Sequence, residues 1–230
     1  MLSVIIPVFN EKNTILKIID KIENLKNLEI EIIIVDDCST DGTREILKNL
    51  NKSKHKVIFH NKNLGKGAAI KSALKYILGD IVIIQDADLE YNPQDYEKII
   101  RPIINNEYLV VYGSRVLKKK RYLKNNFSSV YRIFFNHVLT EISNIINHQN
   151  LTDAHTCYKA FSSEVIKSLN LKEKGFSFCP EVTTKISLKN IHIKEVPIDY
   201  FGRSYSEGKK IKMMDGIKAL ITLLKYRYFA

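Results

Sequence analysis

The residue types best suited to chemistry in this chain are carboxylates that follow short apolar runs. Asp86 and Asp88 stand one residue apart after one such run, and the pair Asp36 and Asp37 follows an earlier one. Carboxylates repel phosphate unless a cation lies between them, so Asp86 and Asp88 indicate a divalent metal that bridges to a phosphorylated ligand. Asp36 and Asp37 are predicted to hydrogen-bond a ribose or a base edge. Turn and helix-cap chemistry is the alternative for either pair.

These acids occur in a basic protein. The chain has 36 Lys and Arg against 25 Asp and Glu, a net charge of +11, which predicts attraction to nucleic acid, an acidic membrane surface or phosphorylated substrates. Its 45% hydrophobic residues exclude a disordered or low-complexity protein. Its 3 cysteines lack CxxC spacing, which argues against a disulfide framework or a zinc module and fits a reducing cytosol.

The first half alternates short apolar runs, typical of strands, with segments whose apolar residues are spaced three and four apart, typical of amphipathic helices. This alternation predicts an α/β fold with a Rossmann-like, doubly wound, mostly parallel sheet and helices on both faces. Ligands of such sheets bind at the carboxyl ends of the strands. The expected strands are 3–6, 31–35, 56–60, 80–85 and 109–112, and the expected helices are 14–25, 43–50, 68–78 and 93–104.

The second half is less regular. It predicts a helix over 130–146, a polar and aromatic cluster over 152–161, a helix from Glu181, a strand over 193–197 and a basic amphipathic tail. No linker or repeat divides the 230 residues, so we expect one domain. The N-terminal run is expected to be a strand rather than a signal peptide, and no stretch reaches the roughly 20 apolar residues of a membrane helix.

A glycine-rich stretch, Asn63 to Gly67, precedes an expected helix. It is not a Walker motif, because His60 and Gly67 stand where that motif requires glycine and Ser or Thr. Two interpretations stay open: a tight turn that allows close helix packing, or a contact to phosphate.

Several segments together resemble the family 2 glycosyltransferases with the GT-A fold. In chain order they are SVIIPVFNE, IIIVDDCSTDGT, NKNLGKGAAI, GDIVIIQDADLEYNP, VVYGSR, TDAHTCYKAF and EVPIDYFGRSYSEGKKIKMMDGIKAL. Within that family the likeness is to the polyprenyl-phosphate sugar synthases of the dolichyl-phosphate mannose and glucose type, and it covers nearly the whole chain.

The resemblance implies a role for individual residues. Implied nucleotide contacts are Pro7, Phe9, Glu11, Val35, Asp37 and Ala87. Implied ligands of Mg²⁺ or Mn²⁺ are Asp86 and Asp88, with Glu90 near the metal; implied phosphate or sugar contacts are Arg115, Arg203 and Lys209. Glu90 stands where mannose synthases usually carry Gln, and Phe9 where Tyr is frequent, so the donor sugar and base stay open.

The implied reaction is an inverting transfer of a hexose from a GDP- or UDP-sugar to a dolichyl or undecaprenyl phosphate. Residues 1–115 are expected to bind the nucleotide sugar, and residues 116–230 to face the acceptor and the membrane. A phosphate acceptor needs no general base, whereas a sugar hydroxyl does. Asp153 and Glu181 are the candidate bases, with helix capping or a salt bridge as the alternative for both.

The segment after Arg115 predicts a membrane contact. It combines basic and aromatic residues with no acid between Val116 and Glu141: Lys118, Lys119, Lys120, Arg121, Lys124 and Arg132 interleave with Tyr122, Phe127, Tyr131, Phe134 and Phe135. The tail repeats this pattern. A mobile surface loop followed by a core helix is the alternative.

We therefore expect a peripheral enzyme on the cytoplasmic face of a membrane, with a membrane-protein partner or a homo-oligomer as further possibilities. Nucleic-acid binding is not expected, because no recognition motif accompanies the basic segment. Two other functions stay open: a family 2 transferase acting on a sugar hydroxyl, and a non-catalytic protein that binds anions or membranes.

Overall fold

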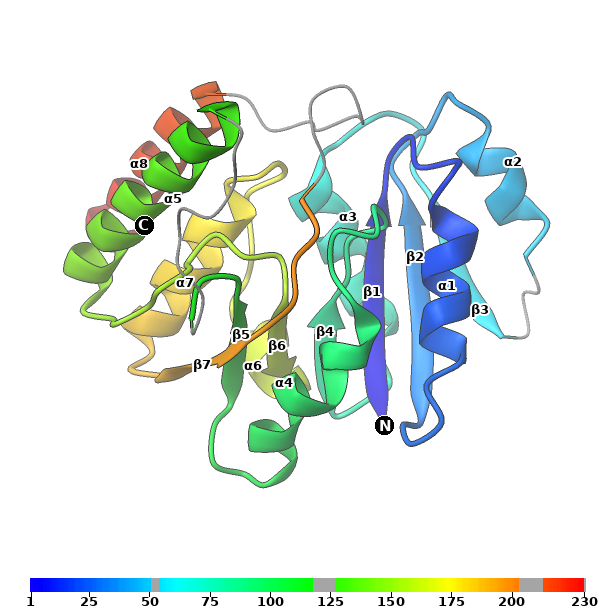
Figure 1. Cartoon of the computed structure of the whole chain (residues 1–230), viewed down its shortest axis with the longest axis horizontal. Coiled ribbons are helices and arrows are strands. Elements are labelled where there is room, and N and C mark those ends of the chain that lie inside the picture. Colours follow the sequence, from blue (N-terminus) through cyan, green and yellow to red (C-terminus); the bar gives the residue numbers. More distant parts are fainter. Residues whose placement is uncertain (51–53, 118–126, 203–212, 230) are drawn as a thin grey trace.

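The computed structural model of the chain describes residues 1–50, 54–117, 127–202 and 213–229 (Figure 1). The strands are β1 (Leu2–Val8), β2 (Ile30–Asp36), β3 (His55–Phe59), β4 (Ile81–Ile84), β5 (Val110–Ser114), β6 (Lys159–Ser162) and β7 (Ile193–Pro197). The α-helices are α1 (Ile15–Glu23), α2 (Thr43–Lys48), α3 (Lys66–Ala73), α4 (Tyr96–Ile104), α5 (Phe127–Asn147), α6 (Ser163–Ser168), α7 (Phe178–Leu188) and α8 (Met213–Tyr228).

The strands form one sheet in the order β3-β2-β1-β4-β6-β5-β7. β1 pairs in parallel with both β2 and β4, and β5 pairs in parallel with β7. β6 runs antiparallel between β4 and β5. The chain thus winds outward from β1 in both directions, and the carboxyl ends of β1 and β4 meet at the switch point where such sheets bind ligands.

Branched aliphatic residues explain why these segments are buried strands. Ile5, Ile33 and Ile83, in β1, β2 and β4, have no exposed surface. Helices cover both faces of the sheet, with α1 and α4 in front of it and α3 behind in Figure 1. α1 buries Ile15, Ile18, Ile19 and Ile22, a spacing of three and four that keeps one helix face on the sheet.

Three helices of the second half form a separate layer at one end of the sheet. α5, α7 and α8 pack on one another, and α5 and α8 lie side by side at the left of Figure 1. β6 and β7 also come from the second half, so a single sheet runs through both halves of the chain.

The α/β class and the mostly parallel sheet are confirmed, and the five strands expected in the first half are present with shifted ends. Two elements were not expected: β6, which begins within the polar cluster, and the short helix α6 that follows it. β6 has four residues and begins with the buried Lys159, so its sequence lacks the apolar run that identifies a strand. α7 begins at Phe178, three residues before the expected Glu181.

Candidate active site

The loops that follow β1 and β2 are joined by hydrogen bonds. The Asn10 amide donates to Ser39 Oγ at 2.9 Å, and the Thr40 amide donates to Asn10 Oδ1 at 2.8 Å. One residue further on, the Glu11 amide donates to Thr43 Oγ1 at 2.9 Å. These hydrogen bonds hold the two loops together at the carboxyl ends of β1 and β2, beside the switch point.

Asp37 has three partners within the protein. Its Oδ1 lies 2.7 Å from His60 Nδ1 and accepts a hydrogen bond from the Leu64 amide at 2.9 Å. Its Oδ2 accepts from the Gly65 amide at 2.7 Å. The Asp37 carboxylate therefore holds the glycine-rich stretch against β2. This agrees with the alternative of turn chemistry for Asp37.

The other implied nucleotide contacts differ in exposure. Pro7 and Phe9 are partly exposed at the end of β1, whereas Val35 and Ala87 are buried in the core. Glu11 is buried and accepts a hydrogen bond from Thr14 Oγ1 at 2.8 Å. The Val35 side chain has no exposed surface, and the implied nucleotide contact of this residue stays a prediction.

Asp36 is also engaged within the protein. Its carboxylate has no exposed surface and forms an ion pair with Arg44, with 2.6 Å between Oδ2 and Nε. This geometry does not favour the expected contact from Asp36 to a ribose, because the buried carboxylate is already paired with Arg44.

Lys66 brings a cation to Asp86, the first of the two carboxylates after β4. It is the first residue of α3, and its ammonium forms an ion pair with Asp86 and donates to Cys157 Sγ at 2.9 Å. Burial alone would lower the pKa of Lys66, but the Asp86 carboxylate raises it well above its usual value. Lys66 therefore remains charged beside Asp86.

The glycines on either side of Lys66 are required by close packing. A Cβ at Gly65 would lie 2.6 Å from the Lys174 carbonyl oxygen, and one at Gly67 would lie 2.5 Å from the Glu173 carbonyl oxygen. Gly65 also has a φ of +92°, which L-residues rarely adopt. These contacts favour the interpretation of the stretch as a tight turn that allows close packing. The structure also shows that Lys66, between the two glycines, pairs with Asp86.

The three acidic residues after β4 have different surroundings. Asp86 pairs with Lys66; Asp88 Oδ1 accepts from the Glu90 amide at 3.1 Å; and Glu90 Oε2 accepts from the Tyr200 hydroxyl at 2.7 Å. The described part of the chain contains no group of three or more His, Cys, Asp or Glu side chains gathered to hold a metal ion. The place of Glu90 near a metal therefore stays a prediction.

Asp86 and Asp88 nevertheless fit a divalent cation in their donor chemistry. Both are partly exposed carboxylates at the end of β4, on the ligand-binding edge of the sheet. Mg²⁺ is commonly held by one or two carboxylates together with substrate phosphates and water, which needs no third protein ligand.

A buried polar network fixes the backbone at Asp86. Gln85 Oε1 accepts hydrogen bonds from the Tyr96 hydroxyl at 2.8 Å and the Tyr158 hydroxyl at 2.6 Å. Its amide nitrogen donates to the Asp86 carbonyl oxygen at 2.9 Å. No local sequence pattern marks the role of these residues, because it depends on contacts between distant segments.

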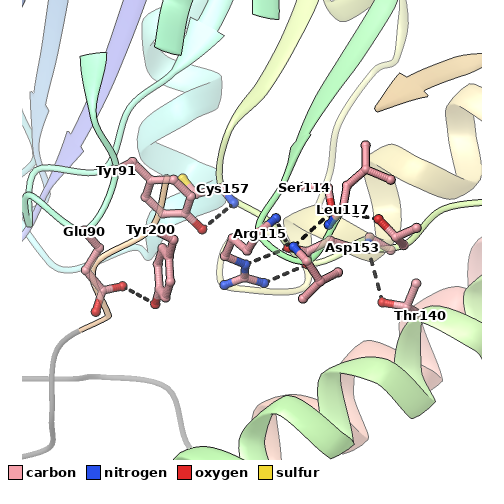
Figure 2. A network of polar contacts seen from close by, with 12 residues as sticks. Glu90, Tyr91, Ser114, Arg115, Leu117, Thr140, Asp153, Cys157 and Tyr200 are labelled. Carbon is pink, nitrogen blue, oxygen red and sulfur yellow. Dashed lines mark hydrogen bonds and ion pairs between the residues drawn. The ribbon is translucent and has the colours of Figure 1, made fainter. Parts of the chain in front are cut away.

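Arg115 and Asp153 form a two-point ion pair beside this site (Figure 2). The guanidinium donates from Nε to Oδ2 at 2.7 Å and from Nη2 to Oδ1 at 2.8 Å, and lies 5.1 Å from the centre of the Tyr200 ring. Burial alone would raise the pKa of Asp153, but Arg115 holds it below its usual value. A carboxylate with a lowered pKa is a weak base, so this geometry matches the salt-bridge alternative for Asp153.

Glu181 also matches that alternative. It has no exposed surface and accepts hydrogen bonds from the Lys172 amide at 2.6 Å and the Glu173 amide at 2.8 Å. Lys185 Nζ lies 2.7 Å from Oε1 of the same carboxylate. Glu181 therefore fixes the loop before α7, which favours the salt-bridge alternative over a catalytic base at this position.

The segment after β7 crosses the site. Tyr200 and Tyr91 form an isolated bridge with ring centres 5.1 Å apart, and the Phe201 amide donates to the Glu90 carbonyl oxygen at 2.9 Å. Figure 2 shows Tyr200 between Glu90 and Arg115. Arg203 and Lys209, the expected phosphate contacts, lie outside the described residues.

α8 carries a row of exposed apolar side chains at helical spacing. Its members are between 40% and 63% exposed: Met214, Ile217, Ile221, Leu224 and Tyr228, here called the outer face of α8. Phe134 and Phe135 are exposed on the neighbouring α5. The basic residues 118–124 lie outside the described residues, as does the side chain of Arg132. Within the described ranges, none of the helices has the length and hydropathy needed to cross a bilayer.

The chain has the GT-A fold. The glucosyl-3-phosphoglycerate synthase of Mycobacterium tuberculosis, solved with Mg²⁺ and uridine diphosphate, superposes with a TM-score of 0.72. The match covers 99% of this chain and 79% of that one, at 20% sequence identity. At this identity the likeness shows the fold alone.

The chain belongs to glycosyl transferase family 2, whose sequence profile matches residues 3–169, and it is an enzyme of that class. The UDP-N-acetylglucosamine–dolichyl-phosphate N-acetylglucosaminyltransferase of Methanococcus voltae is 32% identical, over 97% of this chain and 95% of that protein. The dolichol-phosphate mannosyltransferase of Pyrococcus furiosus is 30% identical, over 90% of this chain and 58% of that protein. The resemblance inferred from the motifs is thereby confirmed.

Proposed function

We propose that this enzyme transfers a hexose from a nucleotide-diphosphate sugar to a polyprenyl phosphate, with inversion by a single displacement. The observation that carries the proposal is similarity along almost the whole chain to a transferase named for dolichyl phosphate. Because this similarity extends beyond residues 3–169, it includes the segments expected to face the acceptor.

On this proposal Asp86 and Asp88 would hold Mg²⁺ or Mn²⁺ at the carboxyl end of β4. A cation bound there would offset the negative charge of the departing nucleotide diphosphate. Asp37 and Glu11 shape the nucleotide side of the site through the loops they hold. Arg115, kept in place by Asp153, contacts the sugar or a phosphate, and Arg203 and Lys209 supply further positive charge.

The surroundings of the two candidate bases favour a phosphate acceptor over a sugar hydroxyl. The Asp153 carboxylate is paired with Arg115, and the Glu181 carboxylate already has three donors as partners. A phosphate monoester with a second pKa of about 6 is largely dianionic at neutral pH and attacks without a base. The site therefore has to align the acceptor with the sugar rather than take a proton from it.

We also propose that the enzyme is peripheral, on the cytoplasmic face of a membrane. The outer face of α8 and the exposed phenylalanines of α5 supply apolar surface, and Lys218 and Lys225 are exposed on α8. The basic segment from Lys118 to Arg132 adds charge for anionic headgroups. The three cysteines are free, which fits a reducing compartment.

A donor panel tests the proposal. Purified enzyme is incubated with Mn²⁺, a short polyprenyl phosphate and one sugar nucleotide at a time: UDP-glucose, GDP-mannose or UDP-N-acetylglucosamine, the last because the M. voltae relative is named for it. We expect one donor to release nucleotide only when the lipid is present. Absence of release from every donor, also with membranes added, would contradict the proposal.

A further inference from the structure

We propose that Lys66 is an internal counter-ion for Asp86 in the absence of metal. When metal and donor bind, the Lys66 ammonium leaves Asp86 and pairs with the donor diphosphate. The inference rests on the proposed function, because it takes Asp86 as a metal ligand. The observation behind it is the ion pair between Lys66 Nζ and Asp86, in which the two side chains are 18% and 22% exposed.

The backbone around Lys66 is fixed from two sides. Asp37 accepts hydrogen bonds from the Leu64 and Gly65 amides, and the Ala68 amide donates to the Lys174 carbonyl oxygen at 2.9 Å. The flanking glycines have no room for a side chain. An exchange of partners at Lys66 therefore takes place in its four-carbon side chain, whose flexibility allows the ammonium to reach a second anion.

The surroundings of the ammonium make this exchange depend on the donor. Besides Asp86, Lys66 Nζ contacts Cys157 Sγ at 2.9 Å, a thiol that brings no second carboxylate to the ammonium. A metal ion that takes over Asp86 leaves the Lys66 charge without compensation and also repels it. The diphosphate of the donor supplies the missing negative charge.

Two consequences follow for binding. Metal alone should bind weakly, because it competes with Lys66 for Asp86. Metal and nucleoside diphosphate should each strengthen the binding of the other, and this coupling is reciprocal by thermodynamic linkage. Removing the ammonium should therefore strengthen metal binding without nucleotide and weaken the coupling.

The test measures Mn²⁺ binding by electron paramagnetic resonance in the wild type, Lys66→Met and Lys66→Gln, with and without UDP or GDP. The signal of the Mn²⁺–nucleotide complex formed without protein is subtracted. Lys71→Met is the matched control, since Lys71 also lies on α3 but donates to the Lys172 carbonyl oxygen. Circular dichroism establishes that each variant is folded.

We expect nucleotide to strengthen Mn²⁺ binding to the wild type and to Lys71→Met by roughly 10-fold or more, within the usual range of such couplings. In Lys66→Met and Lys66→Gln, Mn²⁺ should bind more tightly without nucleotide, and the coupling should be several-fold smaller than in the wild type, with the remainder due to the direct attraction between metal and diphosphate. Coupling in the Lys66 variants equal to that of the wild type would overturn the inference. Absence of Mn²⁺ binding to the wild type under every condition would instead contradict the proposed metal site.

Discussion

The Arg115 guanidinium is held by both oxygens of Asp153, and the Arg115 amide donates to the same carboxylate at 3.1 Å. Asp153 is in turn positioned by Glu195, whose Oε1 accepts from the Asp153 amide at 2.9 Å. The three residues form a chain of contacts that ends at the guanidinium beside Tyr200. Asp153 therefore serves the site by orienting Arg115.

Replacing Asp153 with Asn should impair both stability and turnover. The variant leaves the largely buried Arg115 charge unpaired, so the free energy of unfolding should fall by about 3–5 kcal/mol. Turnover should fall only in part, and the pH profile of kcat/KM should keep its shape, because no proton passes through Asp153. Complete loss of turnover in folded protein, together with loss of the acidic limb of the profile, would show that Asp153 is a base.

The same pair gives stability a defined pH dependence. Because Arg115 lowers the pKa of Asp153 below its usual 3.8, the stabilisation is complete above that value and declines as the pH falls below it. The difference between wild type and Asp153→Asn in urea denaturation should therefore shrink at acidic pH. A difference that stays constant down to pH values below the folded pKa would contradict the assigned pairing.

Replacing Asp86 or Asp88 with Asn should lower transfer by roughly 100-fold or more, because the donor diphosphate loses its cation. Asp80→Asn is the control, since Asp80 precedes the same strand and its side chain is 88% exposed at the opposite end. Transfer is measured with the donor that the panel identifies. Full activity in both site variants would exclude a functional metal at these residues.

Glu181→Gln should reduce stability and spare the chemistry. An amide in place of the carboxylate cannot accept from both loop amides and Lys185, so unfolding should be easier by about 1–3 kcal/mol. The kcat of the folded variant should stay within a few-fold of wild type, as measured below its unfolding temperature. A wild-type stability combined with abolished turnover would indicate a direct catalytic role.

A charge on the outer face of α8 should weaken membrane binding. Ile221→Glu places a carboxylate at a position that is 59% exposed, and we expect roughly 10-fold weaker binding to vesicles of phosphatidylglycerol and phosphatidylcholine. Leu78→Glu is the control, because Leu78 is 77% exposed and lies outside α5 and α8. Equal loss in both variants, or none in either, would remove the outer face of α8 from the membrane contact.

The sequence was sufficient to predict the sheet and the position of the carboxylates. Asp86 and Asp88 follow an apolar run, and in a parallel sheet the end of such a run lies on the binding edge, so their location follows from local pattern. The strand order around β6 did not follow, because β6 is short, begins with Lys159 and is placed between β4 and β5 by tertiary packing.

The partners of the site residues were also beyond prediction. Lys66 lies 20 residues before Asp86 in the chain, and Arg115 lies 38 residues before Asp153. Charge and spacing alone give no reason for these pairings over others in a protein with 36 basic residues. For the same reason, Asp153 and Glu181 were candidate bases until the structure showed the cations beside them.

The most direct test of the proposed function compares two acceptors that differ in one group. The enzyme, its preferred sugar nucleotide and Mn²⁺ are incubated with a polyprenyl phosphate or with the matching polyprenol, and the lipids are analysed by mass spectrometry. We predict a sugar-linked product from the polyprenyl phosphate and none from the polyprenol. Sugar transfer to the polyprenol, or to an added sugar hydroxyl while the polyprenyl phosphate stays unmodified, would contradict the proposed function.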